Sequence, residues 1–62
     1  MYITFDLIEE EIRAYNSLKE AFDHSVELDL YVDAYKLNGK EKATYEGRLC
    51  KNPETGERFW NK

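Results

Sequence analysis

The most constraining feature of the sequence is an alternation of apolar and polar residues that leads into an Asn-Gly pair. The apolar members are Val26, Leu28, Leu30, Val32 and Ala34, and acids or tyrosines stand between them. A period of two residues is typical of a half-buried strand. Asn38-Gly39 then predicts a tight hairpin, because both residues tolerate the positive φ angles of a type I′ turn.

A two-residue loop at this position also predicts the register of the hairpin. Asp29 is expected to face Arg48, and Val32 is expected to face Tyr45. The facing residues are then either oppositely charged or both apolar, which is typical of cross-strand pairs. The pattern therefore predicts a strand over 26–35 whose partner strand follows the Asn-Gly turn.

The N-terminal third of the chain changes from one periodicity to another. Residues 2–7 alternate and predict a short strand. Apolar residues then recur at spacings of three and four, which is typical of an amphipathic helix. The members of this stripe are Ile8, Ile12, Tyr15, Leu18 and Phe22. The spacing predicts a helix over 9–24 that turns Ile12, Leu18 and Phe22 toward the sheet.

The C-terminal segment adds a turn and a strand. Asn52-Pro53-Glu54-Thr55-Gly56 has the composition of a turn, and residues 57–61 are expected to return as a strand. The chain then forms a single α+β domain, 1–62, with one amphipathic helix packed on a small antiparallel sheet in the order β-α-β-β-β. The pattern leaves open whether the first strand pairs with the second or with the last.

Size and composition limit the chemistry that the chain can support. A domain of 62 residues has a small core, so association with a second copy, as a homodimer, is an expected source of stability. Cys50 is the only cysteine, which excludes an internal disulfide and fits a reducing cytoplasmic compartment. Cys50 and His24 are too few for a four-ligand zinc site, and we expect no metal or cofactor. The sequence lacks both a secretory signal and an apolar run of the about 20 residues that a membrane span requires, so we expect no membrane association.

Charge is distributed unevenly along the chain. Residues 1–35 carry a net charge of −7, whereas residues 36–62 carry +3. Polar residues on the outer face of the expected strand 26–35 would stand in one row, namely Glu27, Asp29, Tyr31, Asp33 and Tyr35. Such a row can be a solvated face whose acids pair with the neighbouring strand, or it can bind a basic surface of another protein, because tyrosines are enriched at interfaces and carboxylates attract basic groups.

The favoured functional hypothesis is a small acidic, non-enzymatic protein-binding module that inhibits or regulates a partner with a basic surface. The size and charge resemble those of the inhibitors that phages and mobile elements direct at host enzymes, and regularly spaced carboxylates could act as a DNA mimic, with a nucleic-acid-binding enzyme as the target. The alternative is a nucleic-acid-binding regulator that uses the C-terminal hairpin, where basic residues alternate with aromatic ones. The residues of that alternative are Lys40, Lys42, Tyr45, Arg48, Lys51, Arg58, Phe59, Trp60 and Lys62.

Catalysis has little support in the sequence. His24 has no second histidine or nucleophile in a motif, and a solvated position near the end of the helix explains it. Glu9, Glu10 and Glu11 are consecutive, so on a helix their carboxylates would point in different directions. We therefore expect no catalytic residue and no metal ligand.

Overall fold

A computed structural model describes all 62 residues of the chain, which form five strands, one helix and the loops between them. The strands are β1 (Tyr2–Asp6), β2 (Ile12–Tyr15), β3 (Val32–Asn38), β4 (Lys42–Lys51) and β5 (Arg58–Asn61), and the helix is α1 (Leu18–Glu27). The expected α+β class, with one helix on an antiparallel sheet, is confirmed. The predicted order of elements is kept, with one additional strand, β2, between β1 and the helix.

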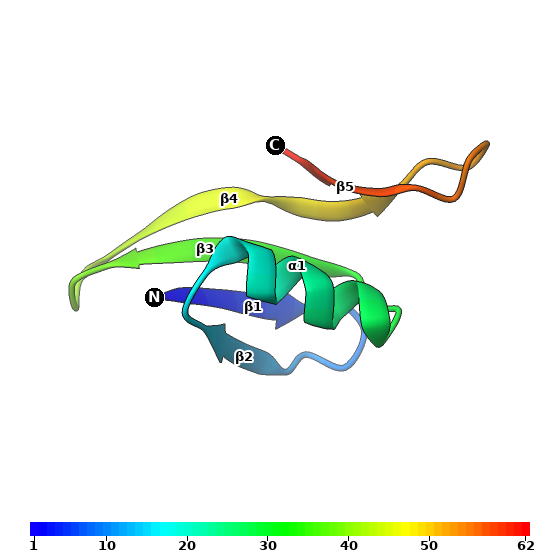
Figure 1. Cartoon of the computed structure of the whole chain (residues 1–62). Helices are drawn as coiled ribbons and strands as arrows, with labels where there is room; N and C mark the ends of the chain where they lie inside the picture. The colour runs from blue at the N-terminus through cyan, green and yellow to red at the C-terminus, as the bar shows by residue number, and fades with distance from the viewer.

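The five strands form one antiparallel sheet in the order β2-β1-β3-β4-β5 (Figure 1). The sequence left the place of the first strand open, and the structure puts β1 between β2 and β3. The hairpin of β3 and β4 extends past the N-terminus and past the end of β5. The single helix, α1, does not have the length or the apolar composition of a membrane-spanning helix.

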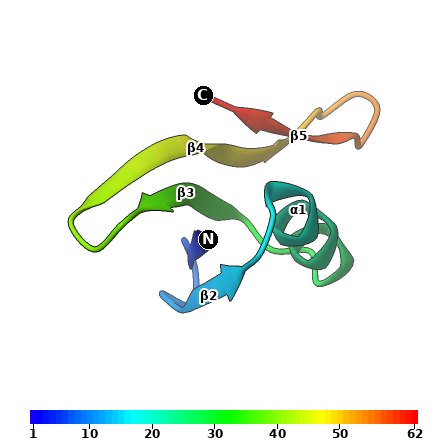
Figure 2. The same cartoon turned by 60° about the vertical axis from the view of Figure 1, so that its left-hand side comes forward.

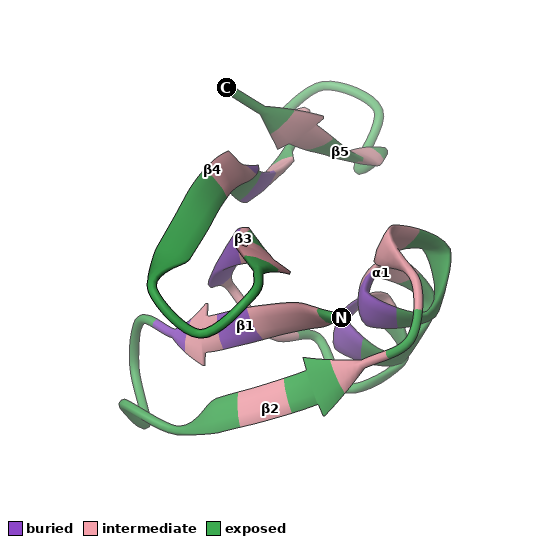
Figure 3. Cartoon of the chain, turned by 90° about the vertical axis from the view of Figure 1, so that its left-hand side faces the viewer, coloured by how far each residue is buried: buried purple, intermediate pink, exposed green.

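Helix α1 covers one face of this sheet, beside β1, β2 and β3 (Figure 2). Ser17 caps its first turn by accepting a hydrogen bond from the backbone N–H of Glu20 at 3.1 Å. The helix buries Ala21 and Ser25, and the sheet face beneath it buries residues of three strands (Figure 3). These residues are Thr4, Asp6, Val32, Ala34 and Leu49. Phe22 extends the contact to β5, where its ring meets Trp60 edge-on at 5.9 Å.

The predicted start of the helix is wrong. Residues 12–15 form β2, and the helix begins only at Leu18. Ile12 and Ala14 alternate with Arg13 and Tyr15, so the segment is amphipathic with a period of two as well as of three to four. Pairing with β1 satisfies the backbone of this segment, and Ile12 consequently lies away from the helix.

The predicted hairpin register is also wrong. The loop contains three residues, Gly39 to Glu41, and Asn38 pairs with Lys42. A bulge in β4 then adds one more residue of offset, so Arg48 faces Asp33 instead of Asp29. This register puts Ala34 opposite Gly47, and it leaves Val32 and Leu49 buried beneath the helix.

The strand predicted over 26–35 begins only at Val32. Leu28 and Leu30 lie in the connection that follows the helix, and Leu28 is exposed. Asp29 adopts a positive φ of 55° there, which a strand does not allow. Tyr45, which the predicted register placed opposite Val32, lies on the other face of the sheet, opposite Tyr35.

Candidate binding surface

The face of the sheet that points away from α1 is covered by no other element, and we call it the open face. Two rows of cross-strand neighbours from β2 to β4 define it. The first row consists of Ile12, Phe5, Asp33 and Arg48. The second row consists of Ala14, Ile3, Tyr35 and Tyr45. Phe59 of β5, which faces Cys50, extends the open face at its far edge.

The open face is rich in apolar and aromatic groups that remain accessible. Ile12 is 66% exposed and Phe59 is 44% exposed. Ile3, Phe5 and Tyr35 are half-buried. Accessible apolar side chains that gather on one face are typical of an interaction surface, whereas single exposed ones are common everywhere.

An ion pair with a shared hydroxyl stands in the middle of the open face. Arg48 binds Asp33 through two hydrogen bonds, Nε to Oδ1 at 2.8 Å and Nη2 to Oδ2 at 3.1 Å. Tyr45 donates its hydroxyl to the same Oδ1 at 3.3 Å. Asp33 is only 8% exposed, so this pairing supplies the partners that a buried carboxylate requires.

The pKa shifts follow from this geometry. The hydrogen bond from Arg48 lowers the pKa of Asp33 below its ordinary value, against the opposing effect of burial. Burial, followed by the nearby charge of Asp33, raises the pKa of Tyr45. Asp33 and Arg48 are therefore both charged at neutral pH, and their charges cancel within the face.

Two tyrosines lie beside this pair. The rings of Tyr35 and Tyr45 are 5.5 Å apart and tilted by 56°, a favourable arrangement for aromatic side chains. The centre of the open face thus holds an internally paired charge and two adjacent aromatic rings, and apolar side chains surround it.

The five residues predicted to form a binding row lie in three different parts of the chain. Glu27 ends α1, Asp29 and Tyr31 lie in the connection after it, and only Asp33 and Tyr35 share a face of β3. The row was expected because the segment alternates, but α1 continues through Glu27 and the strand starts at Val32. The structure therefore places only two of the five residues, Asp33 and Tyr35, on the open face.

Arg58 contacts both Asp29 and Tyr31 on the helix side of the sheet. Its guanidinium lies 4.4 Å from the centre of the Tyr31 ring, and Nη1 binds Asp29 at 3.1 Å. Nη2 also donates to the backbone carbonyl of Leu30. The Arg58 side chain is 7% exposed, so these contacts fasten β5 to the connection that precedes β3.

These ion pairs also bear on the basic hairpin of the alternative hypothesis. Arg48 is paired with Asp33 and Arg58 with Asp29, so two of its six cations are engaged within the chain. Trp60 packs against Phe22 on the helix side, while Tyr45 and Phe59 lie on the open face. The basic and aromatic groups of the hairpin are thus divided between two faces.

The apolar half of the open face was not predicted from the sequence. Ile12 was assigned to the helix, and Phe5 was treated only as part of a half-buried strand. The alternation of Ile12 and Ala14 with Arg13 and Tyr15 is the signal that could have identified β2 and its outward side chains.

The surface offers few other places for a ligand. It has no pocket, and no three histidine, cysteine or acidic side chains gather closely enough to hold a metal ion. No family of proteins, no curated protein and no solved structure matches the chain.

Proposed function

We propose that the chain is a small non-enzymatic protein-binding module that docks through its open face on a partner protein with a basic surface, which it inhibits or regulates. The observation that carries this proposal is the gathering of accessible apolar and aromatic side chains on the one sheet face that lacks a cover. Of the predicted site residues, Asp33 and Tyr35 belong to this docking face.

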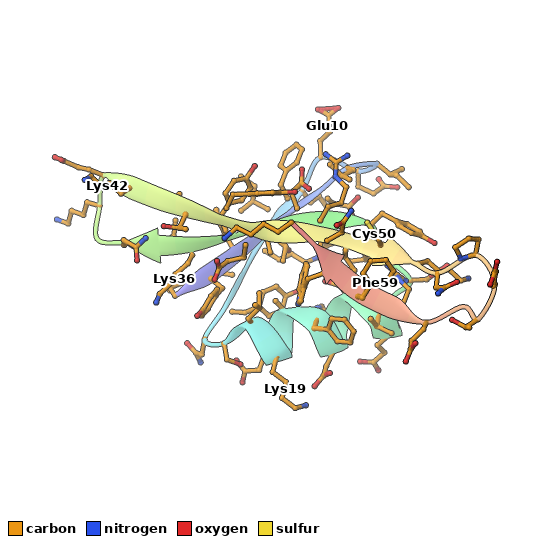
Figure 4. All side chains as sticks on the ribbon, turned by 90° about the horizontal axis from the view of Figure 1, so that it is seen from above. Glu10, Lys19, Lys36, Lys42, Cys50 and Phe59 are labelled. Atoms are coloured by element: carbon orange, nitrogen blue, oxygen red, sulfur yellow. The ribbon has the colours of Figure 1, made fainter.

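Charge argues for a basic partner. The chain carries a net charge of −4, and the charges of Asp33 and Arg48 cancel at the centre of the open face. Glu10, in the loop between β1 and β2, projects on the side of the sheet opposite α1 (Figure 4). Its backbone has a positive φ of 58°, in the left-handed region. A partner with an apolar centre and basic groups at the rim matches this arrangement.

A cytoplasmic location and an origin in a phage or mobile element are further parts of the proposal, and they rest on size, charge and cysteine content. Cytoplasmic binding suits a chain whose single cysteine, Cys50, has no disulfide partner. An origin in a phage or mobile element suits a short acidic inhibitor. Mimicry of DNA requires a regular row of carboxylates. Glu27, Asp29 and Asp33 lie in separate parts of the chain, so mimicry of DNA is not part of the proposed function.

Affinity capture with three baits tests the proposal: the wild-type chain, Ile12→Asp and Leu28→Asp. Ile12→Asp puts a charge into the open face, whereas Leu28 is an equally large apolar residue exposed outside that face. We expect a partner that the wild type and Leu28→Asp retain, that Ile12→Asp loses, and that elutes as salt is raised. Equal capture of the same protein by all three folded baits would contradict docking through this face.

The nucleic-acid alternative has its own test. Binding through the remaining lysines requires affinity for random DNA at low salt that falls steeply as salt rises. The acidic module that we propose is expected to show no such binding to DNA. A salt-sensitive titration would therefore favour the alternative over the proposal.

A further inference from the structure

Strand β4 is longer than β5, the strand that pairs with one of its two edges. Its ten residues run from Lys42 to Lys51, but β5 pairs only with the four from Arg48 to Lys51. Strand β3 occupies the other edge along Lys42 to Arg48. The edge of β4 on the β5 side is therefore unpaired over residues 42–46, where the hairpin extends past β5 (Figure 1).

An unpaired edge presents backbone N–H and C=O groups to any strand that can align with it, and proteins commonly protect such edges with lysines or bulges. Both devices are present here: Lys42 is exposed at the start of this edge, and Glu46, the bulged residue of β4 that has no partner in β3, stands at its end. A lysine disfavours an incoming strand unless that strand brings a carboxylate to the same level. The edge therefore selects for a strand that carries an acid at the right position.

We propose that the partner for this edge is the same edge of a second copy, paired antiparallel around Thr44. In this register Lys42 of each copy faces Glu46 of the other, so both lysines are neutralised by symmetry. Thr44 faces Thr44, and Ala43 faces Tyr45. Opposite charges and paired threonines are favourable cross-strand neighbours, and a twofold axis through Thr44 makes the two edges self-complementary.

The length of the free edge fits this arrangement. The next residue of the second copy, Glu41, belongs to the hairpin loop and would come level with Gly47, beside Lys62, the residue that follows β5. The five residues 42–46 thus fill the space between the end of β5 and the hairpin loop. Two sheets would join into one of ten strands, with the two Tyr45 side chains as diagonal neighbours on a shared open face.

The contact is small, so the dimer should be weak and dependent on concentration. Five residues from each copy bury much less than the roughly 1,600 Å² of a standard stable interface. Sedimentation of the wild-type chain from micromolar to millimolar concentration should therefore show a reversible change from monomer to dimer.

Charge substitutions test the register itself. Glu46→Lys puts two lysines opposite each other at both ends of the contact and should weaken the dimer by about tenfold or more. The matched control Glu54→Lys makes the same change of charge in the exposed loop before β5 and should leave dimerisation unchanged. Lys42→Glu alone should weaken the dimer as Glu46→Lys does.

Combining the two charge substitutions gives the decisive test. A mixture of the Lys42→Glu and Glu46→Lys chains should form a heterodimer more readily than either chain pairs with itself, and the double variant should recover self-association. A wild-type chain that stays monomeric over the whole range would overturn the proposal. Equal effects of Glu46→Lys and Glu54→Lys would also overturn it, because net charge and not register would then govern association.

Discussion

At the residue level, two buried carboxylates link the stability of the fold to pH. The backbone N–H groups of Glu9 and Ile8 donate to Asp6 and are the main reason that its pKa lies below the ordinary value, with Arg13 adding to the effect. The pKa of Asp33 is lowered in the same direction by Arg48. Because an unfolded aspartate has a pKa of about 3.9, the unfolded chain binds more protons than the folded chain below about pH 5.

The fold should therefore be stable at neutral pH and lose stability as the pH falls through about 4 and on toward the lower folded pKa values. Asp6→Asn removes one carboxylate whose charged form the fold favours, so thermal melts at several pH values should show a lower midpoint at pH 7 and a smaller loss on acidification. Glu54→Gln, at an exposed loop position, is the control. A wild-type midpoint that stays constant down to pH 3 would refute the assignment.

Gly47 is a second residue with a definite structural requirement. Its φ is 135°, and a Cβ at this position would lie 3.3 Å from the carbonyl oxygen of Asn61. Gly47→Ala should therefore cost about 1–3 kcal/mol of unfolding free energy, as expected for backbone that only glycine adopts readily.

Gly39 supplies the comparison for Gly47. Its φ is 76°, but a Cβ there would point into open space. Gly39→Ala should cost only about 1 kcal/mol, which is the strain of the left-handed conformation alone. Urea unfolding of the two variants measures the difference, and equal losses would mean that contact with β5 adds nothing at Gly47.

At the level of elements, the same local chemistry occurs at two places, and only one of them begins a helix. Asp6 accepts hydrogen bonds from the N–H groups of Ile8 and Glu9, as a helix cap does, but the chain turns back as β2. Ser17 and Glu20 have the spacing of a capping box, and there the helix does begin. The apolar spacing after Asp6 predicted a helix over 9–24, because spacing alone does not show which segment has a strand to pair with.

The hairpin shows the same limit. Asn38-Gly39 correctly predicted a turn between two strands, and the turn before β5 was also predicted correctly. The register could not be derived, because Arg48 has a suitable acid opposite it both in the predicted register, with Asp29, and in the observed one, with Asp33. The two registers differ in whether Val32, Ala34 and Leu49 are buried together beneath the helix. This burial depends on how the helix packs on the sheet, which the pattern of residues along the chain does not show.

Two substitutions test where the helix begins and what it covers. Phe22→Ala should lower the unfolding free energy by about 2 kcal/mol, because the half-buried ring packs against Trp60. Ile12→Ala should change it by no more than about 0.5 kcal/mol, because Ile12 lies exposed on the open face. Chemical unfolding of both variants decides the matter, and a larger loss for Ile12→Ala would place this residue in the core.

For the whole molecule, the small core means that the proposed association would add to the stability of the fold. Only nine residues are buried, and four of them are polar or charged, so the free energy of folding from apolar burial is modest. The open face and the free edge of β4 therefore leave apolar surface and backbone groups that a partner or a second copy can cover. Either contact would add stability that the isolated chain lacks.

This coupling predicts that the thermal midpoint depends on protein concentration. A dimer that forms only from folded chains stabilises the folded state by mass action, and for a domain of this size a gain of about 1 kcal/mol raises the midpoint by roughly 4–8 °C. Melts of the wild-type chain across the concentration range of dimerisation should therefore shift upward, while Glu46→Lys should show a much smaller shift over the same range. Glu54→Lys should follow the wild type, since the substituted loop lies outside the edge formed by residues 42–46. A wild-type midpoint that is the same at every concentration would show that the edge of β4 contributes nothing to stability.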